Sequence, residues 1–131
     1  MIVIDTSALM AVLLREPRAD ICEDAMTTAD ELIISAGTLA EALVVADRRG
    51  VGAAMRTLLG GLRLTVQPID ATASRRVADA YGQWGKGVHP AGLNLMDCFA
   101  YALAADRGAQ LLFIGNDFAR TDVVAALPRP H

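Results

Sequence analysis

The chain has 131 residues, is 53% hydrophobic and carries a formal net charge of −3 at pH 7. This length is enough for one domain with its own core, and the negative charge argues against a generic nucleic-acid coat. No run approaches the roughly 20 apolar residues of a membrane helix, and Cys22 and Cys98 fit no disulfide or zinc-ligand spacing. We therefore expect a single domain over residues 1–131, in the reducing cytoplasm, without a signal peptide or a membrane partner.

Short apolar runs alternate along the chain with segments that have apolar residues at helical spacing, and Gly or Pro falls at the joints. The predicted strands are 2–5, 31–35, 63–66 and 110–114. The predicted helices are 7–15, 19–29, 37–49, 52–60, 71–84 and 94–107. This alternation predicts an α/β fold with a parallel sheet covered by helices on both faces. One longer irregular loop is expected at 82–92 (GQWGKGVHPAG).

Four acidic residues differ from the others because each one ends or interrupts an apolar run. Asp5 ends IVID, Glu41 lies in LAEALVVA, Asp97 lies in LNLMDCFAYALAA, and Asp117 follows LLFIGN. An ionised carboxylate in such surroundings is costly unless it is paired or bound to a metal. No Arg lies within one helical turn of Glu41 or Asp97, so a local ion pair explains neither residue.

These four acids are also expected to meet. Asp5 and Asp117 come at the carboxyl ends of predicted strands, while Glu41 and Asp97 come in the first turns of predicted helices. In an open parallel sheet both kinds of position lie on the same rim. Four carboxylates at one point either take up protons or hold cations, and a ligand set of oxygens alone suits Mg²⁺ or Mn²⁺. The chemistry of such a site is metal-assisted hydrolysis of a phosphodiester.

Each of the four acids also has a simpler interpretation. Asp5 could cap the helix that starts near Ser7, and Asp117 could be a turn residue in GND. A long-range ion pair could account for Glu41 and Asp97. The neighbours Thr6 and Ser7 could contact a metal-bound water or the phosphate, or serve only the helix start.

Other residues are assigned lesser roles. Asn116 is expected to shape its turn more than to touch substrate, and Asp122 reads as a helix start or a satellite acid. Lys86 and His89 are candidates for RNA contact, although simple solvation of an exposed loop is favoured. The mean hydropathy of +0.36 indicates that a partner or a second copy covers some apolar surface. The helices at 7–15 and 19–29 could form that surface or could only pack in the core.

Four segments together resemble the PIN-domain ribonucleases, specifically the VapC toxins of bacterial toxin–antitoxin pairs. They are MIVIDTSAL, TLAEALVV, HPAGLNLMDCFAYALA and LLFIGNDFARTDV. The resemblance implies a three-layer α/β/α sandwich with a central parallel sheet. It also implies a Mg²⁺- or Mn²⁺-dependent endoribonuclease acting on tRNA or rRNA, a homodimer, and inhibition by a VapB-type antitoxin.

The resemblance assigns the catalytic and metal-binding acids to Asp5, Glu41, Asp97 and Asp117, with Asp5 and Asp97 as the usual metal-holding pair. Met96 departs from the small residue that similar sequences tend to carry before the helix Asp, and core packing is the favoured role for it. Two alternatives stay open. One is a PIN nuclease of RNA processing without an antitoxin, and the other is a catalytically silent PIN module that only binds RNA or protein.

Overall fold

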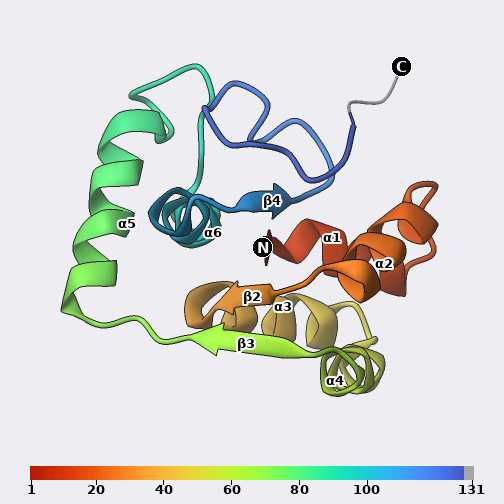
Figure 1. The fold of residues 1–131 in the computed structure, drawn as a ribbon. Coiled ribbons are helices and arrows are strands. Elements are labelled where there is room, and N and C mark those ends of the chain that lie inside the picture. Colours follow the sequence, from red (N-terminus) through yellow and green to blue (C-terminus); the bar gives the residue numbers. More distant parts are fainter. Residues whose placement is uncertain (129–131) are drawn as a thin grey trace.

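The computed structural model describes residues 1–128, and its elements follow the predicted order (Figure 1). The strands are β1 (Ile2–Ile4), β2 (Leu32–Ser35), β3 (Leu64–Gln67) and β4 (Gln110–Leu112). The helices are α1 (Thr6–Leu13), α2 (Ala19–Thr28), α3 (Ala36–Arg48), α4 (Gly52–Gly61), α5 (Ala71–Trp84) and α6 (Leu95–Arg107). The predicted strands and helices are thus confirmed, with ends that move by at most two residues.

The four strands form one parallel sheet in the order β3-β2-β1-β4. Ile2 of β1 lies opposite Leu32 on one side and Gln110 on the other. The chain therefore moves outward from β1 through β2 to β3 and then returns to the other side of β1. In open parallel sheets, ligand sites lie at the carboxyl ends of the strands beside such a reversal, which here falls between β1 and β4.

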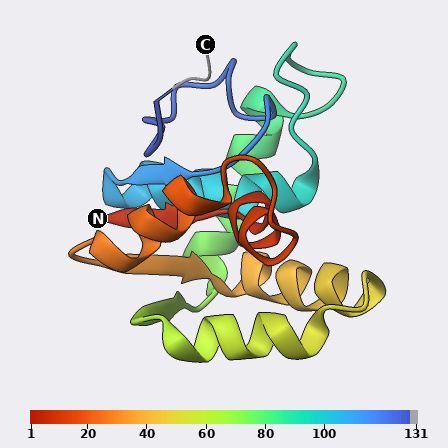
Figure 2. The same cartoon turned by 90° about the vertical axis from the view of Figure 1, so that its right-hand side faces the viewer.

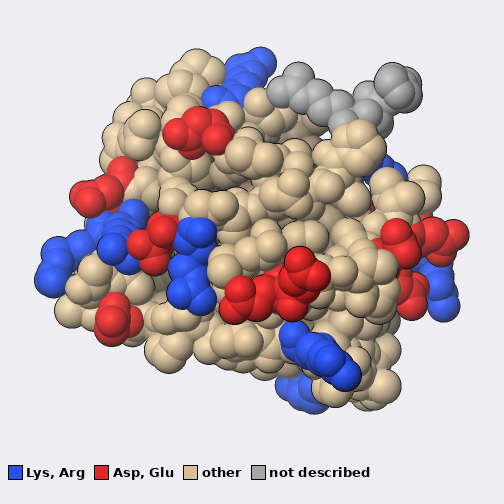
Figure 3. Space-filling model, viewed as in Figure 1, with Lys and Arg blue, Asp and Glu red and all other residues tan. Residues whose placement is uncertain are grey.

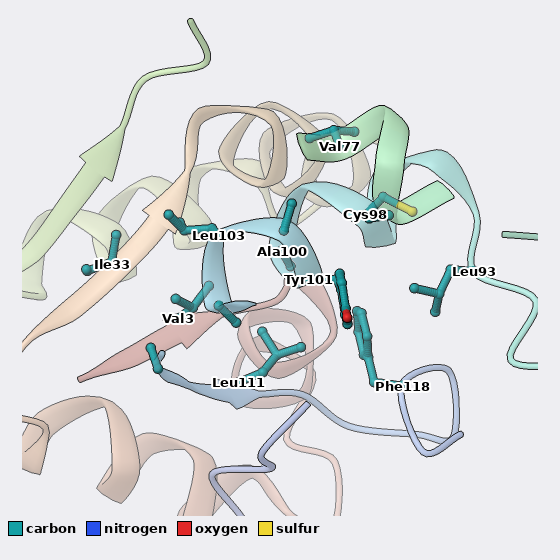
Figure 4. Close-up of a cluster of buried hydrophobic side chains, with 14 residues drawn as sticks. Val3, Ile33, Val77, Leu93, Cys98, Ala100, Tyr101, Leu103, Leu111 and Phe118 are labelled. Carbon is teal, nitrogen blue, oxygen red and sulfur yellow. The ribbon is translucent and has the colours of Figure 1, made fainter. Parts of the chain in front are cut away.

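Alternate side chains of the central strands enter two separate cores, one on each face of the sheet. Val3, Ile33 and Leu111 pack with α5 and α6 (Figure 4). Their neighbours Ile4 and Ile34 pack on the opposite face with residues of α1, α2, α3 and α4. In Figure 1, α5 and α6 lie to the left of the sheet and α1, α2 and α4 to the right. The arrangement is the expected three-layer α/β/α sandwich.

After β4 the chain turns at the rim and then returns along the outer edge of this strand (Figure 2). The Leu111 N–H donates to the Val124 carbonyl at 2.8 Å, and the Ala126 N–H donates to the Leu111 carbonyl at 2.9 Å. The Arg18 guanidinium, at the start of α2, donates to the Pro128 carbonyl at 2.6 Å. Residues 113–128, called the C-terminal segment below, thus cover an edge strand that would otherwise be open to pairing with another chain.

The irregular loop lies at 85–94 instead of the predicted 82–92, which overlapped the predicted helix 71–84. Helix α5 continues to Trp84, so only 85–94 are irregular and 82–84 are helical. The helix extends this far because the Trp84 ring packs against the core formed with α6. The loop is closed at its base, where the Lys86 N–H donates to the Leu93 carbonyl and the Leu93 N–H donates to the Trp84 carbonyl. Within residues 1–128, no helix is both long and apolar enough to cross a bilayer.

Candidate active site

Asp5 directly follows β1 and is the N-cap of α1. Its Oδ2 accepts hydrogen bonds from the Ser7 N–H at 3.0 Å and from the Ser7 hydroxyl at 2.5 Å. The carboxylate is only 5% exposed. The helix-cap interpretation of Asp5 is therefore right, and it coexists with the predicted position at the carboxyl end of the first strand.

Asp97 lies in the first turn of α6, as predicted, and forms a capping box with Asn94. The Asp97 N–H donates to Asn94 Oδ1 at 2.8 Å, while the Asn94 N–H donates to Asp97 Oδ2 at 3.0 Å. These reciprocal bonds satisfy two backbone donors at the start of the helix. They also fix the carboxylate at the rim, where it is buried.

The expected first-turn position of Glu41 is wrong, because Glu41 is the sixth residue of α3. Ser35 ends β2 and also caps α3, because its hydroxyl accepts from the Gly37 N–H at 3.2 Å. The helix therefore starts at Ala36 without a connecting loop, and Glu41 falls in the second turn. Its Oε1 accepts from the Thr6 hydroxyl at 2.6 Å, so this side chain reaches back to the start of α1.

Asp117 is exposed on the C-terminal segment, just past β4. The preceding residue, Asn116, accepts the Ala119 N–H on its backbone carbonyl at 3.1 Å and shapes the turn, as expected. The Ser7 hydroxyl accepts from the Ile114 N–H at 3.0 Å. Ser7 therefore joins the end of β1 to the start of the segment that carries Asp117.

The charges of neighbouring acids reach the two buried carboxylates, Asp5 and Asp97. Burial raises the pKa of Asp5, and the negative charges of Glu41 and Asp117 raise it further against the lowering effect of the Ser7 hydrogen bonds. Burial is also the largest cause that raises the pKa of Asp97 to about 6, and the charges of Asp5, Asp117 and Glu41 add to it. The structure thus places Glu41 and Asp117 within electrostatic range of Asp5, and all three within range of Asp97.

The oxygen donors of this site fit a hard divalent cation. Among the hydrogen bonds of residues 1–128, Asp5, Glu41 and Asp97 each use one carboxylate oxygen, which leaves the other oxygen for a ligand. In the same residues, no three His, Cys, Asp or Glu side chains already surround one point as ligands. An ion held between these carboxylates would relieve their mutual repulsion.

Two of the lesser assignments need correction. His89 is not simply solvated, since its ring packs edge-on against Trp84 at 4.7 Å and its Nδ1 accepts from the Ala91 N–H at 3.0 Å. Asp122 does not start a helix, because it lies in a turn where its Oδ1 accepts from the Tyr101 hydroxyl at 2.5 Å. Lys86 is exposed, as expected.

The structure also separates core residues from surface ones. Met10 and Met26 are buried, so core packing is right for both, while Ile21 of α2 stays exposed. Met96 is half-buried beside Asp97. The sequence interpretation missed Tyr101, and the one available signal was its place four residues after Asp97 on the same face of a predicted helix.

Comparisons with known proteins agree with this architecture. The family model of the PIN domain matches residues 2–124. The ribonuclease VapC28 of Mycobacterium tuberculosis is 39% identical over 131 residues, covering 97% of this chain and 98% of that protein.

Two solved structures share the fold. That of Mycobacterium tuberculosis VapC20, a toxin that cleaves the sarcin–ricin loop, matches with a TM-score of 0.77 at 16% identity, over 98% of this chain and 100% of that one. A toxin–antitoxin complex from Klebsiella pneumoniae matches with a TM-score of 0.74 at 20% identity, over 96% of this chain and 97% of that one.

Proposed function

Because this chain belongs to the PIN-domain family and, within it, to the VapC ribonucleases, we propose that residues 1–131 form one nuclease domain that hydrolyses phosphodiester bonds in RNA with a bound Mg²⁺ or Mn²⁺. The observation that carries the proposal is the convergence of Asp5, Glu41, Asp97 and Asp117 on one rim of the sheet. Within residues 1–128 no salt bridge neutralises these acids, and buried unpaired acids such as Asp5 and Asp97 are expensive for a module that only binds.

The proposed roles follow from how each carboxylate is held. Asp5 and Asp97 are buried and fixed by helix caps, so they are suited to hold the ion. Glu41 and Asp117 would hold a second ion or orient the attacking water. A bound ion supplies a water of lowered pKa and neutralises charge on the phosphate.

Thr6 and Ser7 would act on this site through the carboxylates. The Thr6 hydroxyl orients Glu41, and the Ser7 hydroxyl orients Asp5. Both bonds restrict carboxylates that repel one another, and such pre-orientation lowers the cost of reaching the reactive geometry. Neither hydroxyl needs to touch the RNA in this scheme.

The substrate and partners are proposed by analogy with the relatives. We propose that the substrate is tRNA or rRNA, supported by the cleavage of the sarcin–ricin loop by VapC20, and that the enzyme acts in the cytoplasm. A VapB-type antitoxin is the proposed inhibitor, supported by the toxin–antitoxin complex of similar fold. The face drawn in Figure 3 carries Lys and Arg in separate groups among Asp and Glu, and so offers no broad basic surface to RNA. Exposed apolar side chains such as Ile21 and Val44 suit contacts with the antitoxin or with a second subunit of a homodimer.

The test uses the antitoxin-free protein with a pool of structured RNA in Mg²⁺ or Mn²⁺. We expect cleavage that stops with EDTA and falls by at least about 100-fold in Asp5→Asn, a loss typical of removing one catalytic charge. Asn is as good an N-cap as Asp, so α1 should stay intact in this variant. The matched control is Asp30→Asn, which changes an exposed acid that the site does not use.

Equal cleavage by the wild type and Asp5→Asn would contradict the assigned site. RNA binding without any cleavage would favour the silent module instead. Metal-dependent cleavage by a protein that no co-encoded small protein inhibits would favour an RNA-processing nuclease.

A further inference from the structure

Tyr101 and Asp122 connect the two elements that carry Asp97 and Asp117. The Tyr101 hydroxyl donates to Asp122 Oδ1 at 2.5 Å. The Tyr101 side chain is 6% exposed and lies beside Phe118 in the core (Figure 4), whereas Asp122 reaches it from the surface. A hydrogen bond from a buried hydroxyl to a carboxylate is among the stronger ones in proteins.

Tyr101 and Asp122 each lie a few residues after one of the acids of the site. Tyr101 follows Asp97 by four residues in α6, so both side chains lie on one face of the helix. Asp122 follows Asp117 by five residues, in a stretch of the C-terminal segment that folds into tight turns. There the Ala119 N–H donates to the Asn116 carbonyl at 3.1 Å, and the Thr121 N–H and hydroxyl both donate to the Phe118 carbonyl.

The hydrogen bond between Tyr101 and Asp122 holds the middle of the C-terminal segment, between the backbone hydrogen bonds of Ile114 and Val124. At one end of this part Ser7 holds Ile114, and at the other end Leu111 pairs with Val124. Between these points, the Phe118 ring is buried, Val123 packs against the same core, and Asp122 bonds to Tyr101. A stretch with so few attachments can open locally while the rest of the molecule stays folded.

We propose that Tyr101 and Asp122 are a positioning pair, whose hydrogen bond holds the C-terminal segment against α6 and so sets the distance between the carboxylates of Asp97 and Asp117. The proposal rests on the proposed function, because it assigns Asp117 to the site. Neither residue of the pair needs to touch the RNA or the ion. The pair works over a wide pH range, because burial and the bond to Asp122 raise the pKa of Tyr101 to about 12 and keep its proton in place.

The first readout needs neither metal nor substrate. In Tyr101→Phe and Asp122→Ala, we expect hydrogen–deuterium exchange of 115–123 to become about tenfold faster in the presence of EDTA, with exchange of 95–107 unchanged. Asp122→Asn keeps an oxygen that can accept the hydrogen bond from Tyr101. The exchange rate of 115–123 in this variant should therefore stay close to that of the wild type. The matched controls are Tyr81→Phe and Asp79→Ala, which alter an exposed tyrosine and an exposed acid of α5.

The second readout is steady-state cleavage of RNA. We expect kcat to fall about tenfold in Tyr101→Phe and Asp122→Ala with KM unchanged, because a displaced Asp117 affects the reaction more than the docking of RNA. The double variant should be no worse than either single one, since both remove the same bond. Asp122→Asn should restore most of the rate lost in Asp122→Ala.

Three results would overturn the positioning role. The first is a Tyr101→Phe protein in which residues 115–123 exchange hydrogen for deuterium at the wild-type rate. The second is a variant in which this exchange is faster but kcat is unchanged. The third is a loss of activity that only follows the fraction of folded protein. If the wild-type chain cleaves no RNA, the proposed nuclease function itself is contradicted, and the positioning role is contradicted with it.

Discussion

At the scale of single residues, Asp97 shows how one side chain serves both fold and site. It closes a capping box, which stabilises the start of α6, yet its pKa is raised to about 6 by burial and by three neighbouring acids. A carboxylate with a raised pKa weakens the folded state once it ionises. The position is therefore kept at some cost in stability, as expected for a functional residue.

This raised pKa predicts a pH dependence of the metal-free protein. Asp97 ionises near pH 3.8 when unfolded and near pH 6 when folded, so the folded state binds the proton more tightly. Its contribution to stability is full below about pH 3.8 and is lost as the pH rises through about 6. We expect the Tm in EDTA to be higher at pH 5 than at pH 7, and the difference to shrink in Asp97→Asn. An equal difference in both proteins would show that other groups cause it.

At the scale of elements, the contact of α3 with α6 matters because the two helices carry Glu41 and Asp97. Gly37, in the first turn of α3, lies directly against the Phe99 ring of α6. A Cβ built at Gly37 would stand 2.6 Å from Phe99 Cδ1. The glycine thus permits an approach of the two helices that any larger residue would prevent.

We expect Gly37→Ala to lower stability and RNA cleavage together. Overpacking costs about 1–3 kcal/mol, which exceeds the gain of about 1 kcal/mol from placing Ala in a helix. The matched control is Gly60→Ala in α4, where nothing lies within 4 Å of the added Cβ, and this change should be neutral or stabilising. Denaturant unfolding and cleavage rates measure both effects. A stabilised Gly37→Ala protein would contradict the close contact.

The elements themselves were predictable because local signals mark them. Apolar runs and the Gly or Pro residues between them gave every strand and helix. The start of α3 was predicted one residue too late because Ser35 both ends β2 and caps the helix, a double role with no signal in the spacing. The bond between Tyr101 and Asp122 and the pairing of Leu111 with Val124 were missed for a similar reason. Long-range contacts of one or two residues have no periodicity that a sequence pattern could reveal.

At the scale of the whole molecule, the sheet collects acids from four separate stretches of the chain at one rim. The repulsion among these acids is offset by the burial of apolar side chains in two cores, one on each face of the sheet. The net charge of −3 adds to the local repulsion at the rim. Binding of divalent cations should therefore stabilise the entire fold, because an ion held only by the folded state shifts the unfolding equilibrium.

We expect Mg²⁺ or Mn²⁺ to raise the Tm at pH 7. At an ion concentration 100 times the Kd, the gain is about 2.7 kcal/mol, which corresponds to several degrees for a domain of this size. The same ionic strength supplied as KCl should have little effect, and Asp5→Asn should lose the response. An equal rise in KCl would indicate general screening of charge and would count against a specific site.

The hydrogen bonds of Ser7 have a consequence for how the protein is made. This hydroxyl joins Asp5 to Ile114, two positions more than one hundred residues apart in the chain. On a translating ribosome, at 5–20 residues per second, roughly 5–20 seconds separate their synthesis. The first acid is present throughout this time, but Asp117 and the segment that Ser7 anchors are not. We therefore expect the nascent chain to be inert until the segment that carries Asp117 has been made, and chains that stop before this segment should carry no nuclease activity.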